Sequence, residues 1–249
     1  NLHGAPGGYH KVVWEVLEAT DQKLAMKYVS PDGEAGFPGE LTVYMDYYLT
    51  DDNEFKITYK ATTDKPTIVN LTHHSFFNLN GHGEGNVRNH MLQLNADHFT
   101  PVDDSLIPLG DIKPVKGTPF DFSEPHLIGE RIDDDNEQLK KGGGYDHNWV
   151  INREEGNKET IKTAAVWVPE NGRKMEVFTD QPGVQVYTGN FMNGGGASKA
   201  GKSYGKQGAI CLETQHYPDS PNQPSFPSVT VKPGDTYTHE CIYKFSVIK

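Results

Sequence analysis

Apolar and polar side chains alternate along the segment Leu41-Thr42-Val43-Tyr44-Met45-Asp46-Tyr47-Tyr48-Leu49. Successive side chains of a β-strand point to opposite faces, so a period of two predicts a strand with one buried face. A turn-forming run, Asp51-Asp52-Asn53-Glu54, follows, and the alternation resumes from Phe55 to Ala61. The segment 41–61 is therefore expected to form an antiparallel hairpin.

Two further regions show the same pattern. Val166-Trp167-Val168 and Met175-Glu176-Val177-Phe178 flank Asn171-Gly172, a pair that tolerates the positive φ of a tight hairpin turn. Near the end of the chain, segment 229–231 precedes a Pro-Gly-Asp turn, and alternate residues over 237–247 then share one strand face. The pattern predicts one all-β domain over the whole chain, a large antiparallel β-sandwich or else a barrel, with a short polar helix within about 129–141.

Composition limits the classes of function. The chain has 249 residues, with 34 acidic and 23 basic side chains and a formal net charge of −11. An acidic surface repels phosphate backbones, so no nucleic-acid partner is expected. No apolar run approaches the roughly 20 residues of a membrane-spanning helix, so no membrane partner is expected either. The two cysteines, Cys211 and Cys241, are too few for a disulfide framework.

Two motifs suggest functions that the surrounding sequence does not support. Residues 196–203 match the phosphate-binding pattern GxxxxGK[ST], but Tyr204-Gly205 after them is a poor helix start, which favours a surface loop. His73 and His74 are neighbours, and neighbouring residues on a strand point to opposite faces, so one metal ion could not bind both. The sequence therefore favours neither a nucleotide site nor a metal site.

Polar side chains interrupt several apolar, strand-like runs. His74, Glu213 and Gln185 each stand within such a run, and Asp146 follows a glycine turn that leads into one. A polar group in a buried strand costs free energy unless it is paired or used. Each residue alone could be a satisfied core residue, but together they predict a site for a polar ligand.

Five segments, taken together, resemble those of the aldose 1-epimerase family, the galactose mutarotases. Their order and approximate spacing match the family over essentially all of residues 1–249. The segments are Leu2-His3-Gly4 with Lys11-Val12-Val13-Trp14, Asn70 to Leu79, Gly144 to Asn148, Gln181 to Phe191, and Cys211 to Gln215 with Pro218-Asp219, Asn222-Gln223-Pro224 and Phe226-Pro227.

The resemblance implies a large antiparallel β-sandwich with an open sugar-binding cleft. Members of the family interconvert the α and β anomers of free aldohexoses such as galactose and glucose, and they need no cofactor or metal. Carried over to this sequence, Glu213 is the general base for the C1 hydroxyl and His74 is the general acid for the ring oxygen. His3, Asp146 and Gln185 match positions that bind sugar hydroxyls or the ring oxygen. A glutamate and a histidine suit this task near neutral pH, so no extreme pKa shift is expected.

Some features depart from the family pattern. Ala5 replaces a glycine, His73 an asparagine and Phe76 a frequent tyrosine, but none of these changes removes a named catalytic group. The family also carries more chain before the Leu2-His3-Gly4 segment, including strands and a sugar-binding Arg and Asn. We therefore expect 1–249 to be an N-terminally truncated domain, whose unpaired strand edges would meet its missing N-terminal segment or a dimer partner.

Other functions stay open beside an epimerase whose partner is a free aldohexose. A sugar-6-phosphate 1-epimerase would need extra Arg or Lys at the cleft, and few lie near the motifs. A non-catalytic carbohydrate-binding protein would fit a truncated chain. A retaining glycosidase could use Asp146 and Glu213, but the pairing of His74 with Glu213 argues against it. The cytoplasm is the compartment that the family implies, with the periplasm or secretion as alternatives.

Overall fold

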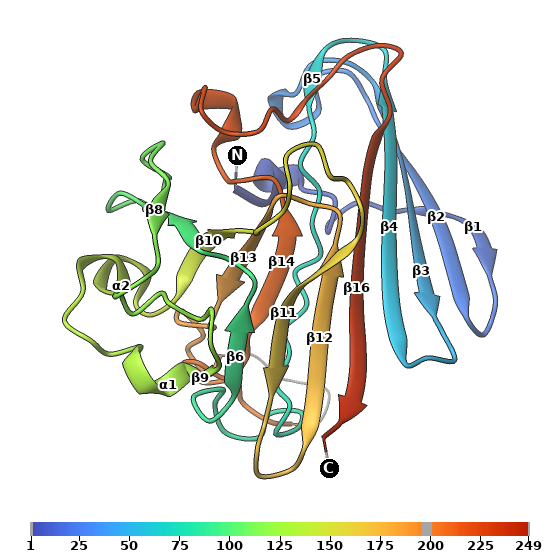
Figure 1. Cartoon of the computed structure of the whole chain (residues 1–249). Helices are drawn as coiled ribbons and strands as arrows, with labels where there is room; N and C mark the ends of the chain where they lie inside the picture. The colour runs from blue at the N-terminus through green and yellow to red at the C-terminus, as the bar shows by residue number, and fades with distance from the viewer. Residues whose placement is uncertain (1, 196–200, 249) are drawn as a thin grey trace.

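The computed structural model describes residues 2–195 and 201–248. In this part of the chain, two antiparallel sheets pack around a shared core (Figure 1). The large sheet has nine strands in the described residues, in the order β1-β2-β3-β4-β16-β12-β11-β6-β9, and the small sheet has five, in the order β14-β13-β10-β7-β8. The pair β5 and β15 forms a third, two-stranded sheet.

The large sheet is built mostly from long strands. Its members are β1 (Glu15–Ala19), β2 (Lys23–Ser30), β3 (Leu41–Leu49), β4 (Glu54–Thr63), β6 (Met91–Leu94), β9 (His126–Leu127), β11 (Ile161–Trp167), β12 (Arg173–Thr179) and β16 (Tyr237–Val247). The small sheet and the third sheet contain β5 (Thr67–Ile68), β7 (His98–Thr100), β8 (Lys113–Pro114), β10 (Asp146–Val150), β13 (Gly183–Tyr187), β14 (Cys211–Gln215) and β15 (Thr230–Val231). The helical elements are η1 (Leu2–Gly7), η2 (Glu34–Gly36), α1 (Ile128–Arg131), α2 (Glu137–Gly142) and η3 (Ser220–Asn222).

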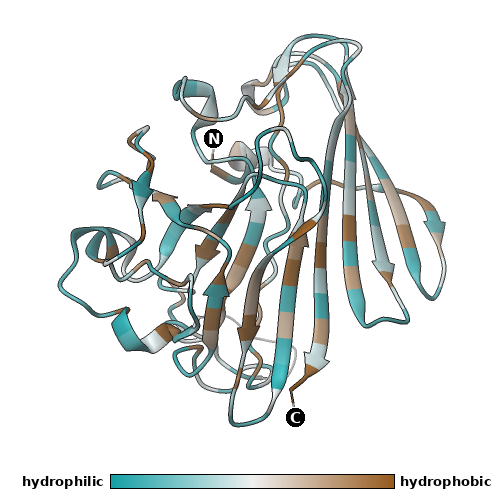
Figure 2. Ribbon diagram, viewed as in Figure 1, coloured by the Kyte–Doolittle hydropathy of each residue, from teal (hydrophilic) through white to brown (hydrophobic). Residues whose placement is uncertain are grey.

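The two hairpins predicted from alternation are confirmed. Strands β3 and β4 pair from Leu41↔Thr63 to Leu49↔Phe55, and Asn53 in the turn has a φ of 59°. Strands β11 and β12 pair around the turn at Gly172, whose φ is 71°. Figure 2 shows the cause, because hydrophobic and hydrophilic bands alternate along the long strands. In the β3–β4 hairpin, for example, the apolar residues Val43, Met45 and Ile57 lie in the core.

The end of the chain folds differently from the predicted pattern. Strand β15 pairs with β5 rather than with the strand that follows it, and β16 inserts between β4 and β12. The helix expected within 129–141 is two short helices, α1 and α2, separated by the run 132–136. Residues 196–200 of the GxxxxGK[ST] match lie outside the described residues.

Aromatic side chains fill the core behind the small sheet. Phe99 and Phe120 stack with ring centroids 4.4 Å apart, and the buried Trp149 donates a hydrogen bond from its indole nitrogen to the carbonyl of Phe120 at 3.0 Å. Trp149 lies on β10, between Asn148 and Val150. This packing fixes β10, and with it the residues that point from β10 to the opposite face.

Truncating a core residue of the large sheet should destabilise the protein strongly. Leu92 on β6 is fully buried, so Leu92→Ala is expected to cost about 2–5 kcal/mol through lost burial and a residual cavity. Leu49→Ala is the matched control, because Leu49 is 57% exposed and its truncation should cost less than about 1 kcal/mol. Urea unfolding of both variants measures the difference, and equal losses would contradict this account of the core.

Candidate active site

The buried carboxylate of Glu213 lies on β14, the edge strand of the small sheet. Its neighbours Leu212 and Thr214 are also buried. Because side chains alternate along a strand, Glu213 points to the face opposite these two residues. Gln185 on β13 stands directly opposite Glu213 in the register, so the two side chains share that face.

A segment without regular secondary structure, 70–78, runs along the open edge of β14. At one end, the side chain of Asn70 donates to the carbonyl of His216 at 2.9 Å and accepts from its backbone N–H at 3.0 Å. At the other end, Phe77 and Ile210 exchange backbone hydrogen bonds of 2.9 and 2.8 Å. The expected regular strand over this segment is wrong, apart from the bridge at Phe77.

Between these anchors, His74 faces the carboxylate. Its Nε2 lies 3.6 Å from Oε1 of Glu213, and the two side chains are 29% and 7% exposed. The ring of Phe76 stacks on the ring of His74, with centroids 4.9 Å apart and planes at 29°. The histidine is thus reachable from solvent on one side while its Nε2 faces the buried Glu213.

His3 also contacts the ring of His74. The rings of His3 and His74 meet edge-on, with centroids 5.3 Å apart and planes at 81°. His3 has a φ of 54°, which non-glycine residues rarely adopt, and such outliers are concentrated at functional sites. Burial lowers the pKa of His3, and the neighbouring His10 lowers it further, which favours a neutral imidazole.

Asp146 and Gln185 form the second half of the site. Gln185 Nε2 donates a hydrogen bond of 2.8 Å to Oδ1 of Asp146, and both are half-buried. Among the described residues, Gln185 Oε1 is buried without a hydrogen-bond partner. Since an unpaired buried acceptor costs free energy, this oxygen is available to a ligand hydroxyl.

Burial governs the electrostatics of the carboxylates. Removal from water, together with the smaller effect of the negative charge of Asp146, raises the pKa of Glu213 to about 8. Burial also raises the pKa of Asp146, opposed by its hydrogen bond from Gln185. The expectation of a pair without a strong pKa shift is therefore wrong for Glu213, whose pKa lies near the working pH of a general base.

The two neighbouring histidines of the segment have different environments. Burial lowers the pKa of His74, and the nearby His3 lowers it further, while the backbone of His74 itself acts in the opposite direction. His73 contacts the rings of Tyr47 and Phe55, and burial lowers its pKa to about 4. His73 is therefore a neutral packing residue, and His74 alone faces Glu213.

One row of polar residues continues past the predicted site. Thr100, Asn148, Gln185 and Glu213 stand opposite one another across β7, β10, β13 and β14. Within the described residues, the side-chain polar atoms of Asn148 and Thr100 are buried without hydrogen-bond partners. Neither residue was predicted from the sequence. Asn148 follows Asp146 by two positions, so strand parity could have placed it on the same face.

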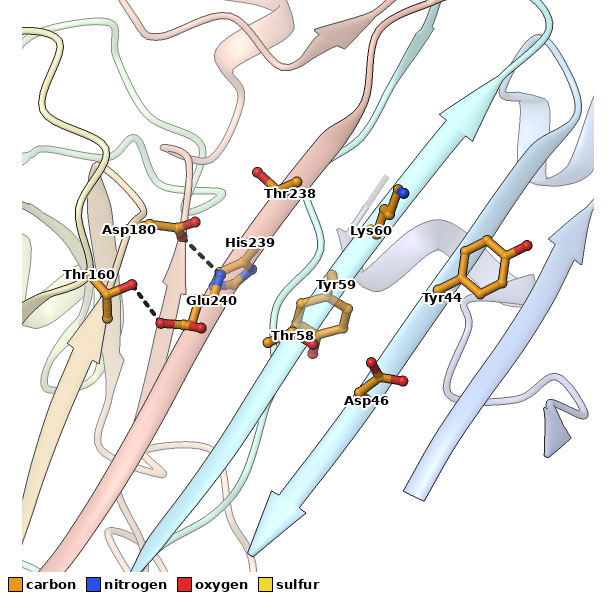
Figure 3. Close-up of a pocket in the computed structure, with 10 residues that line it drawn as sticks. All are labelled: Tyr44, Asp46, Thr58, Tyr59, Lys60, Thr160, Asp180, Thr238, His239 and Glu240. Atoms are coloured by element: carbon orange, nitrogen blue, oxygen red, sulfur yellow. Dashed lines mark hydrogen bonds between the residues drawn. The ribbon is translucent and has the colours of Figure 1, made fainter. Parts of the chain in front are cut away.

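A separate hollow of about 400 Å³ lies over β3, β4 and β16 (Figure 3). Hydrogen bonds join residues of its lining. Glu240 accepts from the Thr160 hydroxyl at 2.7 Å, and Asp180 accepts from the backbone N–H of Glu240 at 2.9 Å. The five residues of the candidate site do not line it.

Among residues 2–195 and 201–248, no group of three or more His, Cys, Asp or Glu could hold a metal ion. No helix within those same ranges is long and apolar enough to cross a membrane.

The structure thus brings together all five residues that the sequence analysis named: His3, His74, Asp146, Gln185 and Glu213. An imidazole faces a buried carboxylate, and the polar side chains of Asp146 and Gln185 stand near them on paired strands. The fold and the site define a β-sandwich protein equipped for acid–base chemistry on a polar ligand.

Comparison with known proteins is consistent with this class. The family model of aldose 1-epimerase matches residues 1–244. The chain is 44% identical over 247 residues to galactose mutarotase of Bos taurus, covering 99% of this chain and 69% of that protein. It is 39% identical over 248 residues to aldose 1-epimerase of Escherichia coli K12, covering 98% of this chain and 70% of that protein. The chain therefore belongs to the aldose 1-epimerase family.

Solved structures confirm the fold. An aldose epimerase homologue from C. elegans aligns with a TM-score of 0.85 and 29% identity, over 99% of this chain and 72% of that one. Galactose 1-epimerase from Lactobacillus acidophilus aligns with a TM-score of 0.80 and 27% identity, over 96% of this chain and 68% of that one. The predicted family and the predicted β-sandwich are both confirmed.

Removing the charge of Asp146 should lower the pKa of Glu213. In Asp146→Asn, the negative charge that raises this pKa is absent, while an amide oxygen can still accept from Gln185. Carbon-13 NMR titration of the glutamate carboxyls measures the shift from about 8. Asp180→Asn is the control, because Asp180 bonds Glu240 instead. An unchanged or higher pKa of Glu213 in Asp146→Asn would contradict the assigned cause.

Proposed function

We propose that this protein interconverts the α and β anomers of free aldohexoses by opening and reclosing the sugar ring. It is an isomerase of the aldose 1-epimerase family, as are its curated relatives. The observation that carries the assignment of residues is the facing pair of His74 and Glu213, whose nearest polar atoms are 3.6 Å apart. Such a pair can remove one proton while it delivers another.

The proposed reaction needs both groups in each direction. Glu213 accepts the proton of the C1 hydroxyl while protonated His74 donates a proton to the ring oxygen. The bond between C1 and the ring oxygen breaks, its electrons stay on that oxygen, and C1 becomes an aldehyde carbon. After rotation about C1–C2, the new hydroxyl attacks the other face of C1. His74 then recovers its proton and Glu213 returns the other, so no proton is gained or lost.

The shifted pKa values suit a pair that holds one proton. The pKa of Glu213 is raised to about 8 and that of His74 is lowered below 6.5. At a pH between these two pKa values, the two groups together carry one proton. The order of these pKa values places that proton mainly on Glu213, while attraction between unlike charges across 3.6 Å stabilises the alternative with protonated His74 and ionised Glu213, which is the reactive form.

The remaining residues bind the sugar in this proposal. Gln185 Oε1 has no partner among the described residues and accepts from a sugar hydroxyl, while Asp146 accepts from another. His3 stands beside His74, where it bonds a hydroxyl near the ring oxygen. Galactose and glucose are the substrates that the family implies, and the cytoplasm is the compartment we propose for the reaction.

Removal of the proposed base should abolish most of the acceleration. Glu213→Gln keeps the shape of the side chain but cannot accept the proton, so kcat should fall about 10²–10⁴-fold. Polarimetry of freshly dissolved α-D-galactose, corrected for the spontaneous reaction, measures it. Glu176→Gln is the control, because Glu176 on β12 bonds Lys174 and takes no part in the site.

Two additional arms separate the alternatives. Acceleration that survives in Glu213→Gln would remove Glu213 from the role of base. Galactose binding by the wild type without acceleration would identify a carbohydrate-binding protein. A clear preference for galactose 6-phosphate over galactose would identify a sugar-6-phosphate epimerase.

The pH dependence should be bell-shaped. Above pH about 8 the pair loses its single proton, and no acid remains to protonate the ring oxygen. Below the lowered pKa of His74, which lies under 6.5, both groups are protonated and no base remains. The profile of kcat/KM from initial polarimetric rates tests this. A rate that keeps rising above pH 9 would contradict the one-proton pair.

A further inference from the structure

Strand β16 supports both of the segments that carry the acid and the base. Tyr237, His239 and Tyr243 alternate along it and share one buried face. Each of the three forms hydrogen bonds with β14 or with segment 70–78. The strand therefore contacts the chain on both sides of the gap between His74 and Glu213.

These contacts are needed because segment 70–78 is irregular. Backbone bonds join Phe77 of this segment to Ile210, the residue that directly precedes β14. Nearer the start of the segment, a side chain makes the bond to β14 in place of a backbone N–H. The Thr72 hydroxyl donates to the carbonyl of Thr214 at 3.0 Å. Buried backbone oxygens need donors, and here hydroxyl groups replace the N–H groups of a regular strand.

Tyr243 bonds the residue that precedes the base. Its hydroxyl donates to the carbonyl of Leu212 at 2.8 Å and lies 3.5 Å from the carbonyl of His73. The side chain is fully buried, and its ring lies against Phe77 with centroids 4.9 Å apart. Since Leu212 and His73 directly precede Glu213 and His74, this hydroxyl contacts both catalytic segments next to their functional residues.

His239 makes a second connection of the same kind. Its Nδ1 lies 3.1 Å from the carbonyl of Leu71, and its Nε2 lies 2.9 Å from the hydroxyl of Thr214. A carbonyl can only accept, so Nδ1 carries the hydrogen and Nε2 accepts from the hydroxyl. Burial lowers the pKa of His239 to about 3, which keeps this tautomer neutral.

We propose that Tyr243 and His239 are positioning residues that set the separation of His74 and Glu213 while never touching the sugar. The inference rests on the proposed function. Both side chains act on the core face of β14, whereas Glu213 points to the opposite face. Loss of either connection would loosen the acid relative to the base and leave Asp146 and Gln185, on β10 and β13, in place.

Tyr243→Phe removes the hydroxyl and keeps the ring. Because an error of about 1 Å in the reacting groups can cost about 100-fold, kcat should fall about 10-fold to 100-fold. KM should stay within about twofold, since the binding residues are untouched. Tyr59→Phe is the matched control, because Tyr59 is a buried tyrosine of the same sheet whose ring meets His239. Its kcat should equal that of the wild type.

Thr214→Val removes the hydroxyl that bonds His239 and leaves Tyr243 unchanged. It therefore tests the inference even where the Tyr243→Phe variant fails to fold. It should give the same fall in kcat at constant KM. Melting temperatures of all variants check folding. Wild-type kcat in Tyr243→Phe and Thr214→Val, or equal losses in Tyr59→Phe, would overturn the inference and leave the proposed function standing. A wild type without acceleration would overturn both.

Discussion

Burial of the Glu213 carboxylate is the constraint on which the rest of the site depends. A charge removed from water is expensive unless a partner compensates it, and the raised pKa of Glu213 measures this cost. His74 is the group that can return a proton at short range. Its own pKa is lowered by the same burial. At pH 7 these pKa values leave both residues uncharged. The pair then carries one proton, which either residue can hold.

Because side chains alternate along a β-strand, Glu213 and the groups that hold its strand in place lie on opposite faces of β14. Along β14, Glu213 points to the site, while Leu212 and Thr214 point into the core toward β16. The backbone carbonyl of Leu212 and the hydroxyl of Thr214 are then bonded by side chains of the large sheet. The two-residue period that packs the sandwich therefore also connects the strand of the proposed base, Glu213, to the large sheet through its core face.

The alternation of apolar and polar residues predicted the hairpins, whose paired strands are close together in the sequence. The β3–β4 and β11–β12 hairpins follow from alternation and turn residues, and they could be derived without the fold. The pairing of β15 with β5 could not, because it joins segments more than 150 positions apart and two-residue strands carry no usable period. The irregular path of 70–78 left no pattern either, since side chains make its hydrogen bonds with β14 and His216, and backbone pairing is confined to Phe77 and Ile210.

The candidate site was likewise predictable from the sequence only in part. The family resemblance identified its five residues. The distances between them depend on the fold, and the pKa of Glu213 depends on burial and on the charge of Asp146 across the sheet. The proposed hydroxyl-binding groups stand on β10 and β13, where backbone pairing on both sides positions them. The unpaired Gln185 oxygen costs free energy in the described protein, and in the proposed function a sugar hydroxyl recovers it on binding. The proposed acid, His74, instead stands on segment 70–78, which side chains hold apart from the backbone bridge at Phe77. The binding half is therefore fixed by the sheet itself, and the catalytic half by a small number of hydrogen bonds that single substitutions can break.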